Sequence, residues 1–435
     1  MSAFQFLAGL QETVGARRAG TSSEEKTLAW LEERCREIGW QPERHPFRYI
    51  GEWYRHVLFL LLLAGPVAAI WLPRWAGLII VALVLSFMGS GRKRIELALA
   101  RTPGTNLIAG LRRPFRAYLA DPERPPALIY CAHYDTARCM PGWSQRLRSV
   151  LRIVLPLALL AFGLYATLEV VNLIAHLLSQ VAPALATAAA TIDRLAGWGG
   201  VVALIAVAPL LLYLLASAAW RLFARQQDSP GADDNGSGVA VLLEVGRRLA
   251  VDRPPGVEVF LAFWGAEELG LYGSRQFVHA FREELLPERT AIINVDCVGV
   301  GQYLSVYAGQ GVLIRRHVDT QQMEQLEAIA QRHGVPTIRT WESIITGGSS
   351  DHAEWVERGY RHTASLIRED YRRPSLPARI LGFLLRLPYI TQLELKHIHS
   401  TADVLEVVRS ERLEESADIA EALGREMGSE GTGNE

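Results

Sequence analysis

Cysteine is scarce in this chain of 435 residues, which contains only four: Cys35, Cys131, Cys139 and Cys297. They show none of the close spacings that build a disulfide framework or a cysteine metal site. A disulfide-stapled scaffold is therefore excluded, and free thiols suit a reducing compartment. Cys131 and Cys297 neighbour the acidic and histidine residues described below, but packing in the core is the simpler role for both.

Three other features are missing. Met1 to Gly20 holds no apolar core long enough for a secretory signal peptide. The formal net charge is −1, so the strongly basic balance typical of nucleic-acid-binding domains is absent and no nucleic-acid partner is expected. The chain shows no internal repeat, which argues against a solenoid.

Five short stretches that carry acids and histidines are the most informative part of the sequence. Four of them fall where an apolar strand ends or a helix begins, and open α/β sheets collect their catalytic groups at such places. The pattern therefore predicts a two-metal hydrolase site. The stretches are His133-Tyr-Asp135, Gly231-Ala-Asp-Asp-Asn-Gly-Ser-Gly238, Ala266-Glu-Glu268, Asn294-Val-Asp296 and His399-Ser-Thr-Ala-Asp403.

The first stretch follows residues 127–132, an apolar run that predicts a buried strand with His133 at its carboxyl end. A metal-bound imidazole usually gives its second ring hydrogen to a carboxylate, so His133 as ligand and Asp135 as its orienting partner form a coherent pair. A histidine at a strand end is, taken alone, more often structural. In the second stretch Asp233 or Asp234 could equally cap the helix predicted over 239–249, with Ser237 as another cap.

Glu267 and Glu268 follow a second apolar strand, predicted over 257–264. Two neighbours at a strand-to-turn junction point in different directions, so one can bind metal while the other moves a proton. A pair of solvated surface acids is the alternative reading. Asp296 ends a third strand, and with Asp234 and Glu268 it would place three negative charges against two zinc dications, a balance that leaves the site able to ionise water.

These motifs resemble the zinc aminopeptidase family, metallopeptidase family twenty-eight, which also contains glutamate carboxypeptidase and glutaminyl cyclase. The resemblance covers 30–50 loosely, then 102–136 and 228–407, and its most diagnostic run is Phe263-Trp-Gly-Ala-Glu-Glu-Leu-Gly-Leu-Tyr-Gly-Ser-Arg275. It implies an α/β fold with a mostly parallel mixed central sheet flanked by helices.

The resemblance also implies a role for each site residue. Asp234 would bridge two zinc ions and precede a cis peptide bond to Asn235. One zinc would be completed by Glu268 and His399, and the other by His133 and Asp296. Glu267 would be the general base that takes a proton from a water bridging the metals and hands it to the leaving amine, with Asp135 as a catalytic residue behind the ligands.

The last ligand departs from the family pattern. The family usually shows Tyr-His-Thr-Pro-x-Asp-Thr, whereas this chain has Ile398-His399-Ser-Thr-Ala-Asp403-Val. The spacing from histidine to aspartate is kept, and His397 is a nearby competitor for the ligand role. Ser350-Asp351-His352 matches another family motif, in which Asp351 and His352 would support the site or face the substrate; a helix cap explains the same residues equally well.

Apolar residues make up 49% of the chain, which suggests that part of it lies in lipid. Four windows approach the roughly 20 apolar residues needed to cross a bilayer: 56–72, 75–88, 153–168 and 201–220. A buried core helix is the alternative for any one window, but charge-free runs such as Leu58 to Ala64 argue against it.

The windows predict two transmembrane hairpins, 51–100 and 141–226, inserted into a peptidase domain formed by 1–50, 101–140 and 227–427, with a disordered tail over 428–435. His133 and Asp234 must reach the same metals, so both must lie on the same side of the membrane. The chain between them therefore crosses the membrane an even number of times. The stretch 170–192 is therefore expected at the far membrane interface. Arginines and a lysine cluster on the peptidase side of the hairpins, which predicts a catalytic domain facing the cytoplasm, in a bacterial inner membrane.

A basic and apolar insertion, 371–396, precedes His399 and suits either docking on a membrane surface or an ordinary amphipathic helix packed on the domain. The sequence as a whole predicts a zinc aminopeptidase that acts on peptide substrates and contacts membrane lipid. The alternatives are a carboxypeptidase, a glutaminyl cyclase-like enzyme, or a metal-free membrane scaffold with the peptidase fold. The oligomeric state does not follow from the sequence.

Overall fold

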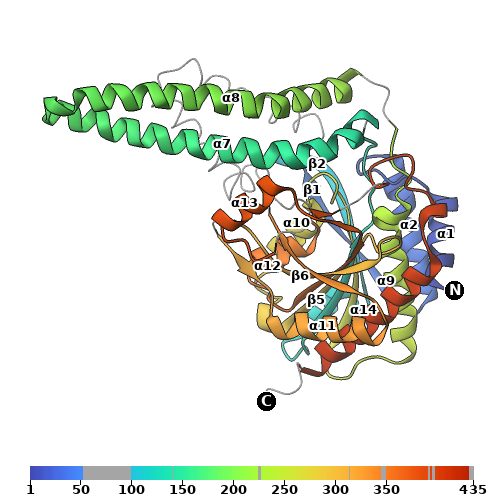
Figure 1. Ribbon diagram of the computed structural model, residues 1–435. Helices are drawn as coiled ribbons and strands as arrows, with labels where there is room; N and C mark the ends of the chain where they lie inside the picture. The colour runs from blue at the N-terminus through green and yellow to red at the C-terminus, as the bar shows by residue number, and fades with distance from the viewer. Residues whose placement is uncertain are drawn as a thin grey trace.

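The computed structural model describes residues 1–51, 99–140, 142–223, 227–312, 314–343, 349–389, 392–393 and 397–430. Within them an α/β domain carries one long helical hairpin on its surface (Figure 1). The first predicted hairpin, 51–100, lies almost wholly outside the described residues. Of the predicted tail, the start belongs to the last helix, α14 (Ser410–Glu430), and 431–435 lie outside them.

One mixed sheet forms the centre of the domain. Four parallel strands lie in the middle in the order β4-β3-β5-β9, and antiparallel strands extend the sheet on both sides to give β1-β2-β4-β3-β5-β9-β6-β7, with β8 parallel to β6. This arrangement confirms the predicted mixed α/β class, with the parallel pairs confined to the centre and to the β6–β8 pair. The strands are β1 (Gln41–Tyr49), β2 (Thr102–Gly110), β3 (Ala127–His133), β4 (Glu258–Trp264), β5 (Thr290–Asp296), β6 (Tyr303–Gln310), β7 (Arg316–His317), β8 (Thr337–Glu342) and β9 (Thr363–Glu369).

Helices cover both faces of the sheet, which explains why every residue of β3 and β4 is buried. Alternate side chains of a strand point to opposite faces, so Leu128 and Tyr130 of β3 join one core cluster and Ile129 and Cys131 join the other. The larger cluster includes α1 (Ala3–Thr13), α2 (Ser22–Glu37), α9 (Gly238–Val251), α11 (Thr320–Arg332) and α14. The smaller one includes α6 (Phe115–Leu119), α10 (Tyr272–Ala280) and α12 (His352–Glu357).

The hairpin consists of α7 (Gly142–Val181) and α8 (Ala186–Phe223), joined by the short turn Pro183–Leu185. Small residues lie between the two helices: Ala189, Ala196 and Ala203 are buried at seven-residue intervals. Gly199 and Gly200 allow close approach, because a Cβ on Gly199 would meet Leu168 Cδ1 at 2.9 Å and one on Gly200 would meet Tyr165 Cε2 at 3.2 Å.

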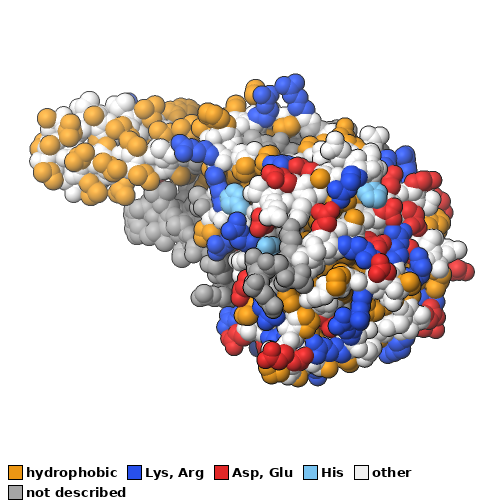
Figure 2. Space-filling model, turned by 90° about the horizontal axis from the view of Figure 1, so that it is seen from below, with side chains coloured by type: hydrophobic (Ala, Val, Ile, Leu, Met, Phe, Trp, Pro, Cys, Tyr) orange, Lys and Arg blue, Asp and Glu red, His pale blue; other side chains and the backbone are white. Residues whose placement is uncertain are grey.

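Large apolar side chains point away from the partner helix. Leu164, Trp198 and Ile205 are 60%, 70% and 67% exposed, and Figure 2 shows hydrophobic side chains over the protruding hairpin. In a water-soluble bundle the large apolar residues lie between the helices. Here small residues lie between them and large apolar residues face outward, which is typical of helices packed in lipid.

Each helix contains a proline and continues past it, Pro156 in α7 and Pro209 in α8. By length and composition, Ile153–Val181 and Pro183–Ala206 are candidate membrane spans. The whole helices are longer than these spans: α7 has 40 residues and α8 has 38, which correspond to about 60 Å at about 1.5 Å per residue, twice the hydrocarbon thickness of a bilayer. The stretch 170–192, expected at the far interface, forms the distal part of this hairpin, and its place relative to a membrane stays a prediction.

Candidate metal centre

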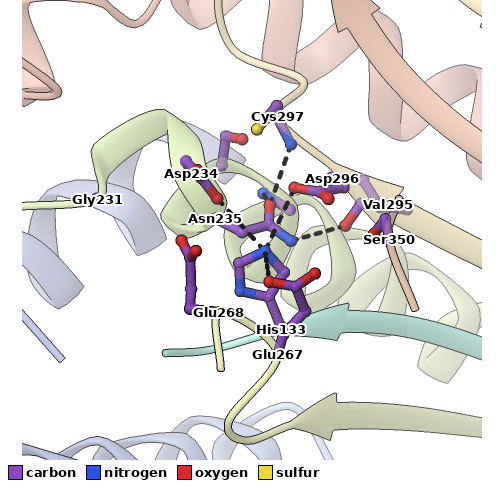
Figure 3. A network of polar contacts seen from close by, with 12 residues as sticks. His133, Gly231, Asp234, Asn235, Glu267, Glu268, Val295, Asp296, Cys297 and Ser350 are labelled. Atoms are coloured by element: carbon purple, nitrogen blue, oxygen red, sulfur yellow. Dashed lines mark hydrogen bonds and ion pairs between the residues drawn. The ribbon is translucent and has the colours of Figure 1, made fainter. Parts of the chain in front are cut away.

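Three parallel strands deliver most of the acidic and histidine side chains to one edge of the sheet. His133 is the last residue of β3 and Asp296 the last of β5, while Glu267 and Glu268 follow β4 by a short turn. Because parallel strands end at the same edge, these residues converge although they are far apart in the sequence. Figure 3 shows His133 among Asp234, Glu267, Glu268 and Asp296.

Asp234 reaches this edge from a tight turn between the hairpin and α9. Gly231 begins the turn with a φ of 63°, and a Cβ there would meet Thr136 Cγ2 at 2.2 Å, so the position requires glycine. The peptide bond between Asp234 and Asn235 is cis, as the family resemblance implied. Asn235 fixes the turn by donating to the Val295 carbonyl at 2.9 Å and accepting from the Gly238 amide at 2.9 Å.

The predicted helix caps in this turn do not form. Ser237 stands at the N-cap position of α9 without a capping hydrogen bond, and its hydroxyl donates to the Asp233 carbonyl. Asp233 accepts from the Gly299 amide at 2.7 Å and pairs with His397 at 2.8 Å. His397 is therefore occupied by Asp233, whereas His399 belongs to one of the two groups that could hold a metal ion.

Two groups of three side chains share Asp234. In the buried group, His133 Nε2 lies 3.4 Å from Asp234 Oδ1 and 3.4 Å from Asp296 Oδ1. In the second group, His399 Nε2 lies 3.0 Å from Asp234 Oδ2 and 3.2 Å from Glu268 Oε2. The two oxygens of one carboxylate thus face the two histidines.

The donor atoms fit zinc. Imidazole nitrogen and carboxylate oxygen are zinc ligands at about 2.0–2.1 Å, and a tetrahedron with such bonds separates its ligand atoms by about 3.3 Å, close to the separations in both groups. Asp296 Oδ1 is buried and accepts no hydrogen bond from the described residues. A zinc ion held by three protein ligands would keep one coordination position open, as in catalytic rather than structural zinc sites.

The pKa values of the clustered side chains also favour a bound metal ion. Burial raises the pKa of Glu267 well above its usual range and Glu268 adds to the rise, although His133 opposes it. Burial would also raise the pKa of Asp234, but its bonds to His133 and His399 outweigh burial and lower it. Burial opposes a positive charge on His133, yet Glu267 and Asp296 raise its pKa well above the usual range. Several carboxylates buried together, away from water, favour the binding of divalent cations.

Asp135 lies behind the ligands, but its contacts differ from those predicted. His133 Nδ1 is 3.1 Å from the Asp135 backbone carbonyl and 3.8 Å from its carboxylate. The carboxylate instead accepts the amides of Glu267 at 3.0 Å and Glu268 at 3.3 Å. The backbone carbonyl of Asp135 therefore orients the histidine, and its side chain holds the glutamate turn.

Two residues near the site were given no role by the sequence. Arg17 is completely buried, and its guanidinium donates to the Tyr134 and Gly231 carbonyls at 2.8 Å each, which ties the loop after His133 to the loop before Asp234. The Asp403 carboxylate accepts the amides of Asp233 and Asp234 at 2.7 and 3.2 Å. An arginine far from the motifs gives no local signal, whereas Asp403 ends the motif that begins at His399.

The Ser350-Asp351-His352 motif lies beside the site. Asp351 occupies the N-cap position of α12 without a capping hydrogen bond, which weakens the cap reading. It is fully buried, and burial raises its pKa to about 7. The Ser350 hydroxyl accepts from Asn294 Nδ2 at 3.0 Å, and His352 Nε2 lies 2.9 Å from Glu342 Oε1. The motif thus forms a layer next to β5 and belongs to neither group of three.

Residues 217–423 match the sequence model of Peptidase family M28. Aminopeptidase YwaD of Bacillus subtilis (strain 168) is 30% identical over 200 residues, which cover 45% of this chain and 37% of YwaD. Probable glutamate carboxypeptidase LAMP1 of Arabidopsis thaliana is 34% identical over 137 residues, which cover 29% of this chain and 20% of LAMP1. The matches thus span well under half the length of these curated relatives.

Among solved structures, the chain resembles BSAP, a zinc aminopeptidase from Bacillus subtilis, with a TM-score of 0.52 and 16% identity over 98% of this chain and 94% of that one. This likeness shows a shared fold. The region matched by the family model contains Asp234, Glu267, Glu268, Asp296 and His399.

Proposed function

The chain contains a peptidase family M28 domain, and from this premise we propose that it is a zinc-dependent exopeptidase that removes amino-terminal residues from peptides. The observation that carries the proposal is the pair of three-residue groups joined by Asp234, with ligand separations of 3.0 to 3.4 Å. His133, Asp234 and Asp296 would hold one zinc ion, and Asp234, Glu268 and His399 a second. Zinc there would polarise the scissile carbonyl and make water a nucleophile at neutral pH.

Glu267 is the group placed to move the proton. Its carboxylate lies 3.8 Å from His133 Nε2, beside the ligands but outside both groups. It would take a proton from the attacking water and pass it to the nitrogen of the leaving amine, which balances the hydrolysis. Asp135 supports this role by holding the Glu267 and Glu268 amides, so the base and its neighbouring ligand keep a fixed separation.

Metal content and peptide hydrolysis, compared between wild type and Glu267→Gln, test this proposal. We expect about two zinc ions per chain in both proteins, with turnover of free-amine peptides that the variant loses by about 10²–10⁴-fold. Glu283→Gln is the matched control, since Glu283 is a surface glutamate whose side chain is 82% exposed. Wild-type activity in Glu267→Gln would refute its role as the base.

The match to a probable glutamate carboxypeptidase favours one alternative specificity. Peptides with blocked amino termini separate the candidates, because an aminopeptidase needs a free amine and a carboxypeptidase does not. Cyclisation of amino-terminal glutamine would instead identify a glutaminyl cyclase-like enzyme. A folded protein without bound metal and without turnover would support a scaffold.

We also propose that α7 and α8 cross a membrane, with the catalytic domain on the cytoplasmic side of a bacterial inner membrane. The outward-facing large apolar side chains and the small-residue seam support insertion, and the basic residues at the domain end of the hairpin support the orientation. A cysteine introduced at Leu185, in the distal turn, should react with an impermeant maleimide in intact cells, whereas one at Val251, on the domain, should react only after the membrane is opened. Equal labelling from the outside would contradict this topology.

A further inference from the structure

The insertion before His399 forms a short amphipathic helix, α13 (Leu376–Leu384). Strands β10 (Tyr371–Arg372) and β11 (Gln392–Leu393) pair at its base, so the insertion leaves the domain and returns to it just before His397. Ala378, Leu381 and Gly382 are buried, which anchors one side of the helix. Figure 1 shows α13 beside α7, the first helix of the hairpin.

The opposite side of α13 is apolar and exposed. Leu376 is 65% exposed, Ile380 44%, Phe383 80% and Leu384 61%. Their spacing of four, seven and eight residues from Leu376 places them on one face of the helix. A hollow of about 520 Å³ adjoins this face, lined by residues that include Leu376, Ile380, Phe383 and Leu387. Contiguous exposed apolar surface of this kind marks a site of interaction.

The charge of the insertion indicates the kind of partner. Residues 371–389 contain four arginines and neither aspartate nor glutamate. Of these arginines, Arg373, Arg379 and Arg386 are exposed. A short helix with one exposed apolar face and flanking arginines matches the interface of a bilayer, in which the apolar face enters the acyl boundary and the cations approach anionic headgroups.

Packing connects α13 to the candidate membrane spans. Leu159 and Leu160 of α7 pack against the same core cluster as Ala378 and Leu381 of α13, and both leucines lie within Ile153–Val181. We propose that α13 docks in the interface of the lipid bilayer beside the hairpin, with Leu376, Ile380, Phe383 and Leu384 toward the acyl chains. The bilayer is thus the one occupant of this face that also explains the arginines and the neighbouring span.

Docking there would restrict the motion of the loop that contributes His399 to the second group of candidate ligands, since His397 and His399 follow β11 closely in the chain. Peptides held at the membrane surface would then be the substrates that reach the site most readily. This consequence rests on the proposed peptidase function, whereas the docking itself does not, and the two are separable by experiment.

Spin labels on the full chain reconstituted in vesicles of phosphatidylcholine and phosphatidylglycerol test the docking. Phe383→Cys reports on the exposed face of α13, and Val251→Cys is the matched control, an apolar residue that is 86% exposed on the domain. Both are made with Cys139→Ser, because the other native cysteines are buried. Collision of each label with oxygen, which concentrates in lipid, is compared with collision with a water-soluble nickel complex.

We expect the label at 383 to gain collisions with oxygen and lose collisions with nickel, while the label at 251 shows the reverse. Arg379→Gln should weaken the protection of the label at 383 in these anionic vesicles. If the label at 383 met nickel as freely as the label at 251, the face would be in water and the proposal would fail. Protection from both agents would overturn it as well, because protein, such as the segment 52–98, would then cover the face. Neither readout depends on zinc or on turnover.

Discussion

The two halves of the candidate site differ in burial although they share Asp234. The side chains of His133 and Asp296 are 1% and 12% exposed, and both end strands in the middle of the sheet. His399 is 26% exposed and belongs to a loop, and Glu268 lies on the turn after β4. A ligand on a packed strand loses little freedom when metal binds, whereas a ligand on a loop must be ordered first. The buried half should therefore hold metal more tightly and exchange it more slowly.

The backbone is unusual in the turns that carry ligands of both halves. His399 itself has a φ of 53°, Cys297, directly after Asp296, has a φ of 50°, and Ala266, directly before Glu267, has a φ of 54°. Positive φ is costly for residues other than glycine and persists where the surroundings enforce it. Here these residues lie at the sheet edge, within or directly beside the segments that carry the candidate ligands.

Removal of single candidate ligands should have the largest effect and should separate the two halves by their zinc content. We expect His399→Ala to keep about one zinc ion per chain, in the buried half, while Asp234→Ala loses both, because only Asp234 serves the two groups. His133→Ala should leave less metal than His399→Ala, since the remaining half depends on a loop. Activity should fall in all three variants by more than the about 10–100-fold typical of changes behind the ligands. Elemental analysis after dialysis against a weak chelator gives the order.

Equal zinc retention by His133→Ala and His399→Ala would show that burial does not separate the two halves. Circular dichroism provides the control for folding. His397→Ala is the matched variant, because His397 pairs with Asp233 rather than joining either group, and it should retain both metals.

The sequence was most informative where chemistry and strand ends coincide. The apolar runs before His133, Glu267 and Asp296 predicted three strands that end at one edge, and the structure brings these side chains together with Asp234 and His399. Side-chain packing decides what the sequence left open. Only the fold shows that Asp233 engages His397, or that the Asp135 carboxylate holds amides instead of the His133 ring.

Arg17 offers a second test of the buried half. Its guanidinium donates hydrogen bonds to the backbone of two loops, and Arg17 belongs to neither group of candidate ligands. Arg17→Met removes donors from the Tyr134 and Gly231 carbonyls, which should cost about 1–3 kcal/mol of stability. Zinc affinity should also fall by about 10–100-fold, as is typical for groups that orient ligands. Thermal unfolding with and without zinc measures both effects.

Arg18→Met is the matched control for Arg17→Met. Arg18 is the next residue in the chain and forms a partly exposed ion pair with Asp228 at 2.9 Å, and such pairs contribute about 0–1 kcal/mol. If Arg17→Met lost stability without any loss of zinc affinity, Arg17 would serve the fold alone.

The smallest effect is expected at Glu24, which contacts the residue next to His133. Its carboxylate accepts from the Gly20 amide at 2.8 Å and from the Tyr134 hydroxyl at 3.2 Å, and burial raises its pKa. The folded protein therefore binds this proton more tightly than the unfolded chain does, and stability falls as pH rises above the ordinary glutamate range. Glu24→Gln removes the charge. The Tyr134 hydroxyl can donate its hydrogen to the Thr105 carbonyl at 2.7 Å instead, and its oxygen can then accept a hydrogen bond from the new amide. The variant should unfold like wild type at acidic pH and at a slightly higher temperature at neutral pH, with zinc content unchanged. A lower unfolding temperature at neutral pH would mean that the ionised carboxylate stabilises the buried half.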